Sequence, residues 1–502
     1  MPTPRSRPNI LFLLNDHQAY YGHGKMAGGP PIQRPCFDSL CSGGVEFRKA
    51  YTAAPLCGPA RRGMLTALLP HNHGEITNDA NHPYDREVYV DTLAAAGYRN
   101  FYYGKWHAGG GAAHDHHCEG FSYPSYGNPY ITPEYADYLK ETGLPAPSIA
   151  LRRHFQPWSP QALEESLRTG VPYVQDKPWC NEHATGILTT PTQTHEAFFL
   201  AHLACRKLRE LAAEAEGGPP FHLRVDFWAP HQPYFPTQEF AGLYNPRDIP
   251  EYPNFRDTLE GKPKSFRAEE NVGISRNGIL LQPNPLPWNI WQETLALCYA
   301  QITLVDAAGG LILRALEELG LAESTLVIWS TDHGDALACH GGHFDKDAYL
   351  PEEMLRIPLA VRLPGAKRRG RRSERLVSNM DIPATILHAA GASFASPVDG
   401  RSLLPLCEDP KAPWRENLVC ESHGHITHTV SRVLVTAKRK YVWNQGDVEE
   451  LYDLEADPYE MRNLAGDADA AESLRDMRER LGREQTAQQT AQQTCSPQTA
   501  EA

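Results

Sequence analysis

The most distinctive short motif of the chain is Cys57-Gly58-Pro59-Ala60-Arg61, in which a proline and an arginine follow a cysteine at fixed spacing. A cysteine side chain can carry nucleophilic, covalent catalysis. The same five residues also fit a buried cysteine beside a proline turn. The motif alone leaves both interpretations open, so its meaning depends on the residues that the rest of the chain places around it.

Two acidic–histidine pairs, Asp16-His17 and Asp332-His333, each follow a short apolar run. The runs, Asn9 to Leu14 and Thr325 to Ser330, are typical of buried strands in a parallel sheet. In open α/β sheets, sites form at the carboxyl ends of such strands. We therefore expect both pairs to lie at one edge of the sheet.

Strands and helices alternate along most of the chain. Further strands are predicted at residues 98–103, 221–228 and 358–363, and helices at residues 91–96, 195–215 and 298–319. This alternation predicts βαβ units, and hence an α/β fold with a mostly parallel sheet flanked by helices. Residues 120–190 and 245–290 lack periodicity and are predicted to be irregular insertions, either walls of a substrate pocket or surface decoration.

The pattern changes after about residue 405. Antiparallel strands are predicted at residues 430–436 and 440–444, and a helix at residues 471–483. Residues 484–502 are polar and of low complexity, and such a segment cannot bury enough apolar surface to order itself. The predicted organisation is a large α/β domain with the candidate site (1–405), a small C-terminal α+β subdomain (406–483) and a disordered tail (484–502).

The composition is ordinary for a soluble globular protein, with 502 residues, 41% of them hydrophobic, and a net charge of −13. No basic run is long enough to track a nucleic-acid backbone, and Lys367 to Arg372 is predicted to be a solvated loop. No stretch approaches the roughly 20 apolar residues of a membrane span. The apolar run Ile10 to Leu14 is too short for a signal peptide. Eleven cysteines without paired spacing are predicted to be reduced. We expect a cytoplasmic protein without nucleic-acid or membrane partners, although a processed precursor stays open.

Further blocks surround these motifs in order along the chain. They are Pro8-Asn9-Ile10-Leu11-Phe12 with Asp16; Arg34-Pro35, Phe37-Asp38 and Gly44-Val45-Glu46-Phe47; Pro70-His71-Asn72-His73-Gly74; Gly104-Lys105-Trp106-His107; Pro230-His231-Gln232-Pro233-Tyr234; Thr331 to Asp335 with Lys346 and Arg356-Ile357-Pro358; and Leu451-Tyr452-Asp453-Leu454 with Asp457-Pro458. Together with the cysteine motif they resemble the type I sulfatases of the alkaline phosphatase superfamily, over residues 8–465. The resemblance implies an alkaline-phosphatase-like fold and hydrolysis of sulfate monoesters to an alcohol and inorganic sulfate.

The resemblance also implies a modified nucleophile. In this family a maturation enzyme oxidises the motif cysteine to a formylglycine aldehyde, which hydrates to a diol. One hydroxyl attacks sulfur and displaces the alcohol, and the other loses its proton and expels sulfate, which regenerates the aldehyde. Cys57 is then the formylglycine precursor. The expected partners are the maturation enzyme and a sulfated small molecule or carbohydrate.

The same blocks imply one divalent cation. Its ligands would be Asp16, Asp332, His333 and the formylglycine oxygen at position 57. His17 is a further candidate ligand, because family members often carry a second acid at its position. Ca²⁺ is the usual ion of the family, and the nitrogen donors leave Mn²⁺ or Mg²⁺ open.

Five other residues take catalytic roles by resemblance. Lys105 and Lys346 would hold the sulfate oxygens and offset charge in the transition state. Arg61 would orient the diol. His107 would act as the base in sulfate release, and His231 would protonate the leaving alcohol.

Two other functions stay open. Phosphonate monoester and phosphodiester hydrolases of the same superfamily share C-G-P-A-R and the Asp-His metal pair, but they typically lack the G-K-W-H block that residues 104–107 carry. The second alternative is a non-catalytic protein that binds an anion or a metal beside an unmodified Cys57. A histidine cluster at residues 114–118 (HDHHC) has the composition of a metal site, but its spacing does not place four ligands around one ion.

Overall fold

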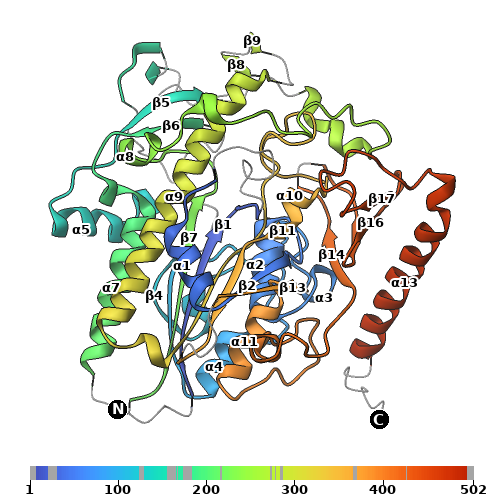
Figure 1. Cartoon of the computed structure of the whole chain (residues 1–502). Coiled ribbons are helices and arrows are strands. Elements are labelled where there is room, and N and C mark those ends of the chain that lie inside the picture. The colour runs from blue at the N-terminus through green and yellow to red at the C-terminus, as the bar shows by residue number, and fades with distance from the viewer. Residues whose placement is uncertain are drawn as a thin grey trace.

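The computed structural model describes residues 7–20, 31–123, 129–154, 165–166, 168–172, 184–214, 218–271, 274–276, 279–282, 286–365, 370–425 and 427–493. Within these residues every cysteine is a free thiol, as predicted. Figure 1 shows the arrangement of the chain, with the central sheet between layers of helices and the C-terminal strands to one side.

The central sheet of the described chain has nine strands, in the order β11-β2-β12-β10-β1-β7-β3-β4, with β13 paired to β2. Neighbours from β10 to β4 are all parallel, so the carboxyl ends of five strands meet at one edge, as the sequence predicts. β12 runs antiparallel to both β10 and β2. The bounds are Asn9–Asp16 (β1), Val45–Tyr51 (β2), Arg99–Lys105 (β3), Cys118–Tyr123 (β4), Phe221–Pro230 (β7), Thr325–Thr331 (β10), Arg356–Ile357 (β11), Leu359–Arg362 (β12) and Arg371–Ser378 (β13).

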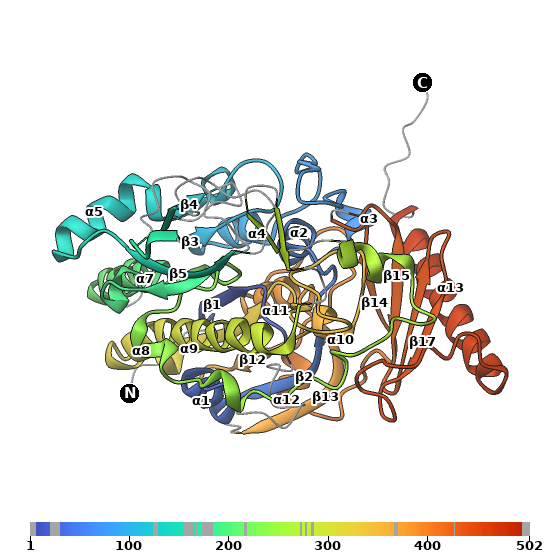
Figure 2. The same ribbon diagram turned by 90° about the horizontal axis from the view of Figure 1, so that it is seen from above.

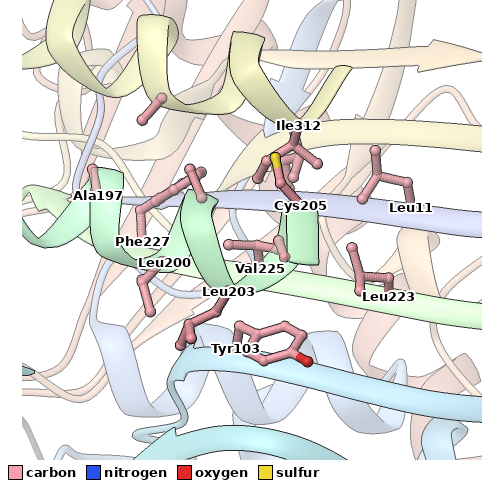
Figure 3. Close-up of a cluster of buried hydrophobic side chains, with 14 of the residues drawn as sticks. Leu11, Tyr103, Ala197, Leu200, Leu203, Cys205, Leu223, Val225, Phe227 and Ile312 are labelled. Atoms are coloured by element: carbon pink, nitrogen blue, oxygen red, sulfur yellow. The ribbon is translucent and has the colours of Figure 1, made fainter. Parts of the chain in front are cut away.

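Helices cover both faces of this sheet (Figure 2). Leu11 and Leu13 of β1 pack into one apolar layer with α1 (Pro35–Gly43), α7 (Glu196–Ala213) and α9 (Trp288–Glu318). The alternate residues of β1 pack into the other layer with α2 (Cys57–Thr66), α4 (Tyr89–Ala95) and α11 (Asp381–Ala389). Because both faces are covered, β1 is apolar at successive positions instead of alternating with polar residues. Figure 3 shows Leu200 and Leu203 of α7 beside Val225 of β7 in the first layer.

The long helix α9 departs from the sequence prediction in two ways. It begins at Trp288 instead of residue 298, and the buried positions Ile290, Trp291 and Leu295 show that the helical pattern starts there. By length and composition α9 could cross a membrane, so the expectation that no stretch approaches a membrane span was wrong. In the structure 83% of its most apolar window is buried inside the protein, which is typical of a core helix.

The C-terminal part forms a four-stranded antiparallel sheet, as predicted for an α+β unit. Its order is β14 (Leu418–Ser422), β15 (Ser431–Val435), β16 (Arg439–Asn444) and β17 (Glu450–Asp453). The closing helix α13 spans Ala471–Gln493. The prediction of disorder from residue 484 was therefore wrong for the first ten tail residues, which continue the helix; residues 494–502 lie outside the described chain.

The first predicted irregular insertion contains regular elements. α5 (Pro133–Thr142) is capped at its start by Thr132, whose side chain accepts from Tyr135 N, and at its end by Gly143, which has a φ of 69°. These are ordinary start and stop signals of a helix, so the prediction overlooked them. β5 (Ile149–His154) pairs with β6 (Ala184–Leu188) in the same region. In the second insertion, β8 (Ile274–Arg276) pairs with β9 (Ile279–Gln282).

Candidate active site

Four neighbouring parallel strands each lead into a residue of the predicted site. Asp16 is the last residue of β1 and Lys105 the last residue of β3. Asp332 follows β10 directly, and His231 follows β7. Because β10, β1, β7 and β3 are adjacent in the sheet, these four buried side chains converge at one edge. This is the position that the strand-end rule predicts.

Cys57 is the first residue of α2, a helix that is buried along its whole length. Its Sγ lies 3.1 Å from His333 Nε2 and 3.7 Å from Asp16 Oδ1. Burial, together with the negative charge of Asp16, raises the pKa of the thiol to about 12. Without a bound cation, the unmodified thiol is therefore protonated at neutral pH and is a weak nucleophile.

Asp16, Cys57, Asp332 and His333 form one group, with ligand atoms that all lie within 4.8 Å of one another. His333 Nδ1 lies 2.8 Å from the carbonyl oxygen of Gly334, an atom that can only accept. Nδ1 therefore carries the proton, and Nε2 presents its lone pair to the group, as a metal-binding imidazole must. Two carboxylates and an imidazole nitrogen fit a divalent cation.

Arg61 lies one helical turn after Cys57 and binds the carboxylates around this group. Its guanidinium donates to Asp332 at 2.9 Å and to Asp16 at 3.2 Å, and Lys105 Nζ also pairs with Asp16. Burial alone would raise the pKa of Asp16, but Lys105 and Arg61 hold it well below its usual value. Asp16 is therefore ionised, which is the form that a metal ligand needs.

Asp226 belongs to this charge network, although the sequence analysis did not select it. It lies inside β7 and accepts from Arg61 at 3.0 Å, from Arg224 at 2.7 and 2.8 Å and from Tyr102 at 2.7 Å. The signal was an arginine and an aspartate inside the strand at residues 221–228, which is buried throughout. Charges persist in such a place only when they are paired, so the strand itself indicated a network.

His231 and Lys346 form a buried pair. His231 Nδ1 donates to the Gln232 carbonyl oxygen at 2.7 Å, and Nε2 lies 3.2 Å from Lys346 Nζ. Lys346 also pairs with Asp345 at 2.9 Å. Burial and the charge of Lys346 lower the pKa of His231 well below its usual value. The imidazole is therefore neutral, and its Nε2 accepts from the Lys346 ammonium group.

Gln301 of α9 holds the loop that carries His231. Its Oε1 accepts from Phe235 N at 2.7 Å, and its Nε2 donates to the carbonyl oxygens of His231 at 3.1 Å and Pro233 at 3.2 Å. Two prolines in this loop have no N–H, so the loop has fewer backbone donors of its own. One buried carboxamide therefore makes three of the bonds that fix the loop.

His107 lies two residues after Lys105, with a left-handed φ of 40°. Burial, together with the charges of Lys105 and Arg61, lowers its pKa well below the usual value. A neutral imidazole can accept a proton, as the predicted base must.

His17, the further candidate ligand, lies outside the group of Asp16, Cys57, Asp332 and His333, and falls in another group of possible ligands with His231 and Asp345. Its ring lies 4.7 Å from the ring of His333 and 4.9 Å from that of His231, measured between centroids. Its Nε2 is 3.5 Å from both Asp335 and Asp345. The His17 side chain therefore lies beside the carboxylates of Asp335 and Asp345.

The histidine cluster at residues 114–118 has other partners. His116 Nδ1 lies 2.9 Å from Asp91, and its ring stacks on Trp106 with an interplanar angle of 18°. His114 Nε2 lies 3.1 Å from the Gly120 carbonyl oxygen. Among the described residues, no group of metal-ligating side chains includes this cluster.

Comparison with known proteins identifies the class. The Sulfatase family model matches residues 8–392, and the model described as N-sulphoglucosamine sulphohydrolase, C-terminal, matches residues 339–487. The fold is that of the alkaline-phosphatase-like hydrolases. The chain belongs to the sulfatase family, and it is a sulfuric ester hydrolase.

Individual relatives agree with this class. N-acetylglucosamine-6-O-sulfatase of Bacteroides thetaiotaomicron is 24% identical, over 95% of this chain and 86% of the relative. A structure solved in complex with its substrate D-glucosamine-2-N,6-O-disulfate is 22% identical, with a TM-score of 0.71 over 99% of this chain and 100% of that one. The phosphonate monoester hydrolase of Agrobacterium radiobacter is 21% identical, with a TM-score of 0.73 over 96% of both chains. The two structures are alike in fold to a similar degree, so the fold does not separate the two kinds of reaction.

Proposed function

We propose that this protein hydrolyses sulfate monoesters of carbohydrates, using a formylglycine made from Cys57 by a maturation enzyme and one divalent cation. The observation that carries the proposal is the buried convergence of Cys57 with Asp16, Asp332 and His333 at the carboxyl edge of the sheet. The formylglycine is proposed from the motif Cys57-Gly58-Pro59-Ala60-Arg61, which resembles the modification motif of the family.

When bound, the cation would serve as a Lewis acid on the sulfate group, and the diol would supply the nucleophile. Asp16, Asp332 and His333 would hold the cation. Mixed oxygen and nitrogen donors are compatible with Ca²⁺, Mn²⁺ and Mg²⁺, and we propose Ca²⁺ from the family resemblance.

The remaining residues would bind the sulfate and move protons. Lys105 and Lys346 would hold the sulfate oxygens and offset their charge. Arg61 binds two of the proposed ligands, so it would also keep the metal site in shape. His107 would accept the proton during sulfate release. His231 would pass a proton to the leaving alcohol, and Lys346, which donates to its Nε2, is the nearest source of that proton.

A carbohydrate substrate is proposed from the relatives. The relative from B. thetaiotaomicron is named for a sulfated amino sugar, and the similar solved structure holds D-glucosamine-2-N,6-O-disulfate. The G-K-W-H block at residues 104–107 favours sulfate over phosphonate esters, since phosphonate hydrolases typically lack it.

The test uses protein produced together with a maturation enzyme. Intact-mass analysis of the peptide that contains Cys57 should show the loss of mass that converts thiol to aldehyde. The same sample should release sulfate from sugar sulfates faster, by kcat/KM, than it hydrolyses a phenylphosphonate monoester. An unmodified peptide from an active sample would refute the formylglycine, and a preference for the phosphonate ester would refute the sulfatase assignment of the site.

A further inference from the structure

His340, Glu353 and Glu460 form a second buried group that shares no residue with the candidate active site. His340 lies in the loop between β10 and α10 (Glu352–Leu355), and Glu460 follows β17. Their ligand atoms all lie within 4.8 Å of one another, and each residue is at most 6% exposed. An ion at equal distance from three atoms 4.8 Å apart would be about 2.8 Å from each, so small side-chain shifts reach the roughly 2.0–2.2 Å of zinc bonds.

The orientation of His340 is that of a metal ligand. Its Nδ1 donates to Asp257 Oδ2 at 2.8 Å, so Nε2 is the nitrogen that faces the group. Nε2 is buried, has no hydrogen-bond partner in the described part of the chain, and lies 3.8 Å from Glu353 Oε2. A carboxylate that fixes the far nitrogen of a metal-binding imidazole is the usual support for such a ligand.

Carboxylates outnumber lysines around this group. Five carboxylates and two lysines meet in it, each at most 9% exposed: Asp257, Glu352, Glu353, Glu450, Glu460, Lys262 and Lys440. Lys440 pairs with Glu460, and Lys262 lies 3.6 Å from Asp257. Arg356 lies 4.0 Å from Glu352. Against the effect of burial, the carboxylates of Asp257 and Glu353 raise the pKa of His340, so a proton on His340 supplies part of the balance when no ion is bound. A divalent ion would take the place of that proton and balance carboxylates that the lysines leave unpaired.

Glu460 is held in this position by an unusual backbone. Its φ is 54°, in the left-handed region that non-glycine residues seldom adopt. Its Oε2 accepts from Glu352 N at 2.8 Å, and its carbonyl oxygen accepts from Lys262 at 2.6 Å. Strain of this kind persists where several contacts enforce it, often at binding sites.

We propose that His340, Glu353 and Glu460 bind a second divalent metal ion, separate from the catalytic one. One imidazole nitrogen with carboxylate oxygens is a donor set typical of Zn²⁺. The ion would join three parts of the fold: the loop after β10, which carries His340, the helix α10, which carries Glu353, and the C-terminal part, which carries Glu460. The start of the loop is already bound to α10, since Asp335 N donates to the carbonyl oxygen of Glu353 at 2.9 Å. It would thereby fix the loop that carries Lys346.

Metal content per chain tests this site without measuring activity. The full-length protein is dialysed against Zn²⁺, then against buffer, and all divalent metals are counted by mass spectrometry. We expect two ions in the wild type, one in Glu353→Gln and one in Asp332→Asn. Glu450→Gln is the matched control, since it removes a carboxylate of the same cluster that is not among the three ligands, and it should keep two ions.

A single ion in the wild type, or an unchanged count in Glu353→Gln, would overturn the site and leave lysines and bound protons to balance the cluster. If a variant fails to fold, the metal content of the wild type still tests the proposal. Anomalous diffraction at the zinc edge from Zn²⁺-loaded wild-type crystals should show a peak between His340 Nε2 and Glu353. Absence of that peak would equally refute the proposal.

Discussion

Cys57 combines full burial with a position against the metal group. We expect Cys57→Ala to abolish sulfate release, because no other side chain can replace the nucleophile. The variant should still fold, since the change removes one sulfur atom and adds no volume. Sulfate release and circular dichroism check the two expectations. More than trace turnover by the folded variant would exclude the formylglycine mechanism.

His231 is tested best by comparing leaving groups. A sugar or alkyl alcohol cannot depart without a proton, whereas a nitrophenolate can. His231→Ala should therefore lower kcat/KM by about 10²–10⁴-fold on alkyl or sugar sulfates and much less on nitrophenyl sulfate. General damage to the site would slow both substrates alike. An equal loss on both would assign proton donation to another group, with Lys346 next in line.

At the residue scale, the sequence predicted what local motifs carry. Asp16, Cys57, Lys105, His231 and Asp332 stand in short patterns at strand ends or a helix start, and the structure brings them together. Asp226 was not predicted as a site residue, because its role depends on partners far away in the sequence, such as Arg61. Gln301 was not predicted for the same reason, since the loop that it binds lies about 70 residues earlier in the sequence.

The loop after β7 gives a prediction at the element scale. Gln301→Leu should leave three loop groups without their buried partner, at about 1–3 kcal/mol for each buried group left unsatisfied. A displaced His231 should lower kcat by about 10²-fold with a smaller effect on KM. Gln292→Leu is the control: it lies on the same helix and loses a bond to the Ile249 carbonyl oxygen. Equal kcat in the two variants would contradict the positioning role.

The start of α7 provides a pH-dependent test. Glu196 accepts from Ala229 N at 2.9 Å, and burial raises its pKa from 4.5 to about 7. The folded protein therefore keeps a proton that the unfolded chain releases above about pH 4.5, and stability falls as pH rises to about 7. Glu196→Gln keeps the acceptor and removes this loss, which is about 3 kcal/mol at most.

Thermal unfolding at pH 5 and pH 8 measures the effect. The Tm of the wild type should fall more between the two values than that of Glu196→Gln. A parallel pH dependence in both proteins would show that Glu196 does not titrate in this range.

Element boundaries were predicted where strong local signals exist. A glycine at position 320 predicts the end of the helix at residues 298–319, and α9 ends close to it, at Glu318. The start of α9 was missed because residues 288–297 lie in a stretch rich in proline and tryptophan. α13 continues beyond residue 483 because glutamine and alanine favour helix, and this preference outweighed the low complexity of the tail.

The helix α13 packs against the C-terminal sheet through three apolar residues, and Glu484 accepts a hydrogen bond from Asn417 at 3.0 Å. Leu474, Met477 and Leu481 pack with Leu434 and Tyr441 of the C-terminal sheet. A chain ended at Gln485 should therefore keep its activity and a Tm within about 2 °C of the full-length value. A chain ended at Ala470 should lose solubility, because it exposes that apolar surface. Scanning fluorimetry and sulfate release check both truncations, and a large loss in the longer one would show that the tail contributes to the fold.

The burial of Cys57 has a consequence for the order of events during biosynthesis. In the folded protein the side chain is 0% exposed, so an enzyme that modifies it must act before the strands close around it. The closing residues Asp332 and His333 come 275 positions later in the chain. At about 5–20 residues per second, a ribosome needs about 14–55 s to add them. The proposed modification would therefore compete with translation, and the yield of active protein should depend on how fast the chain is made.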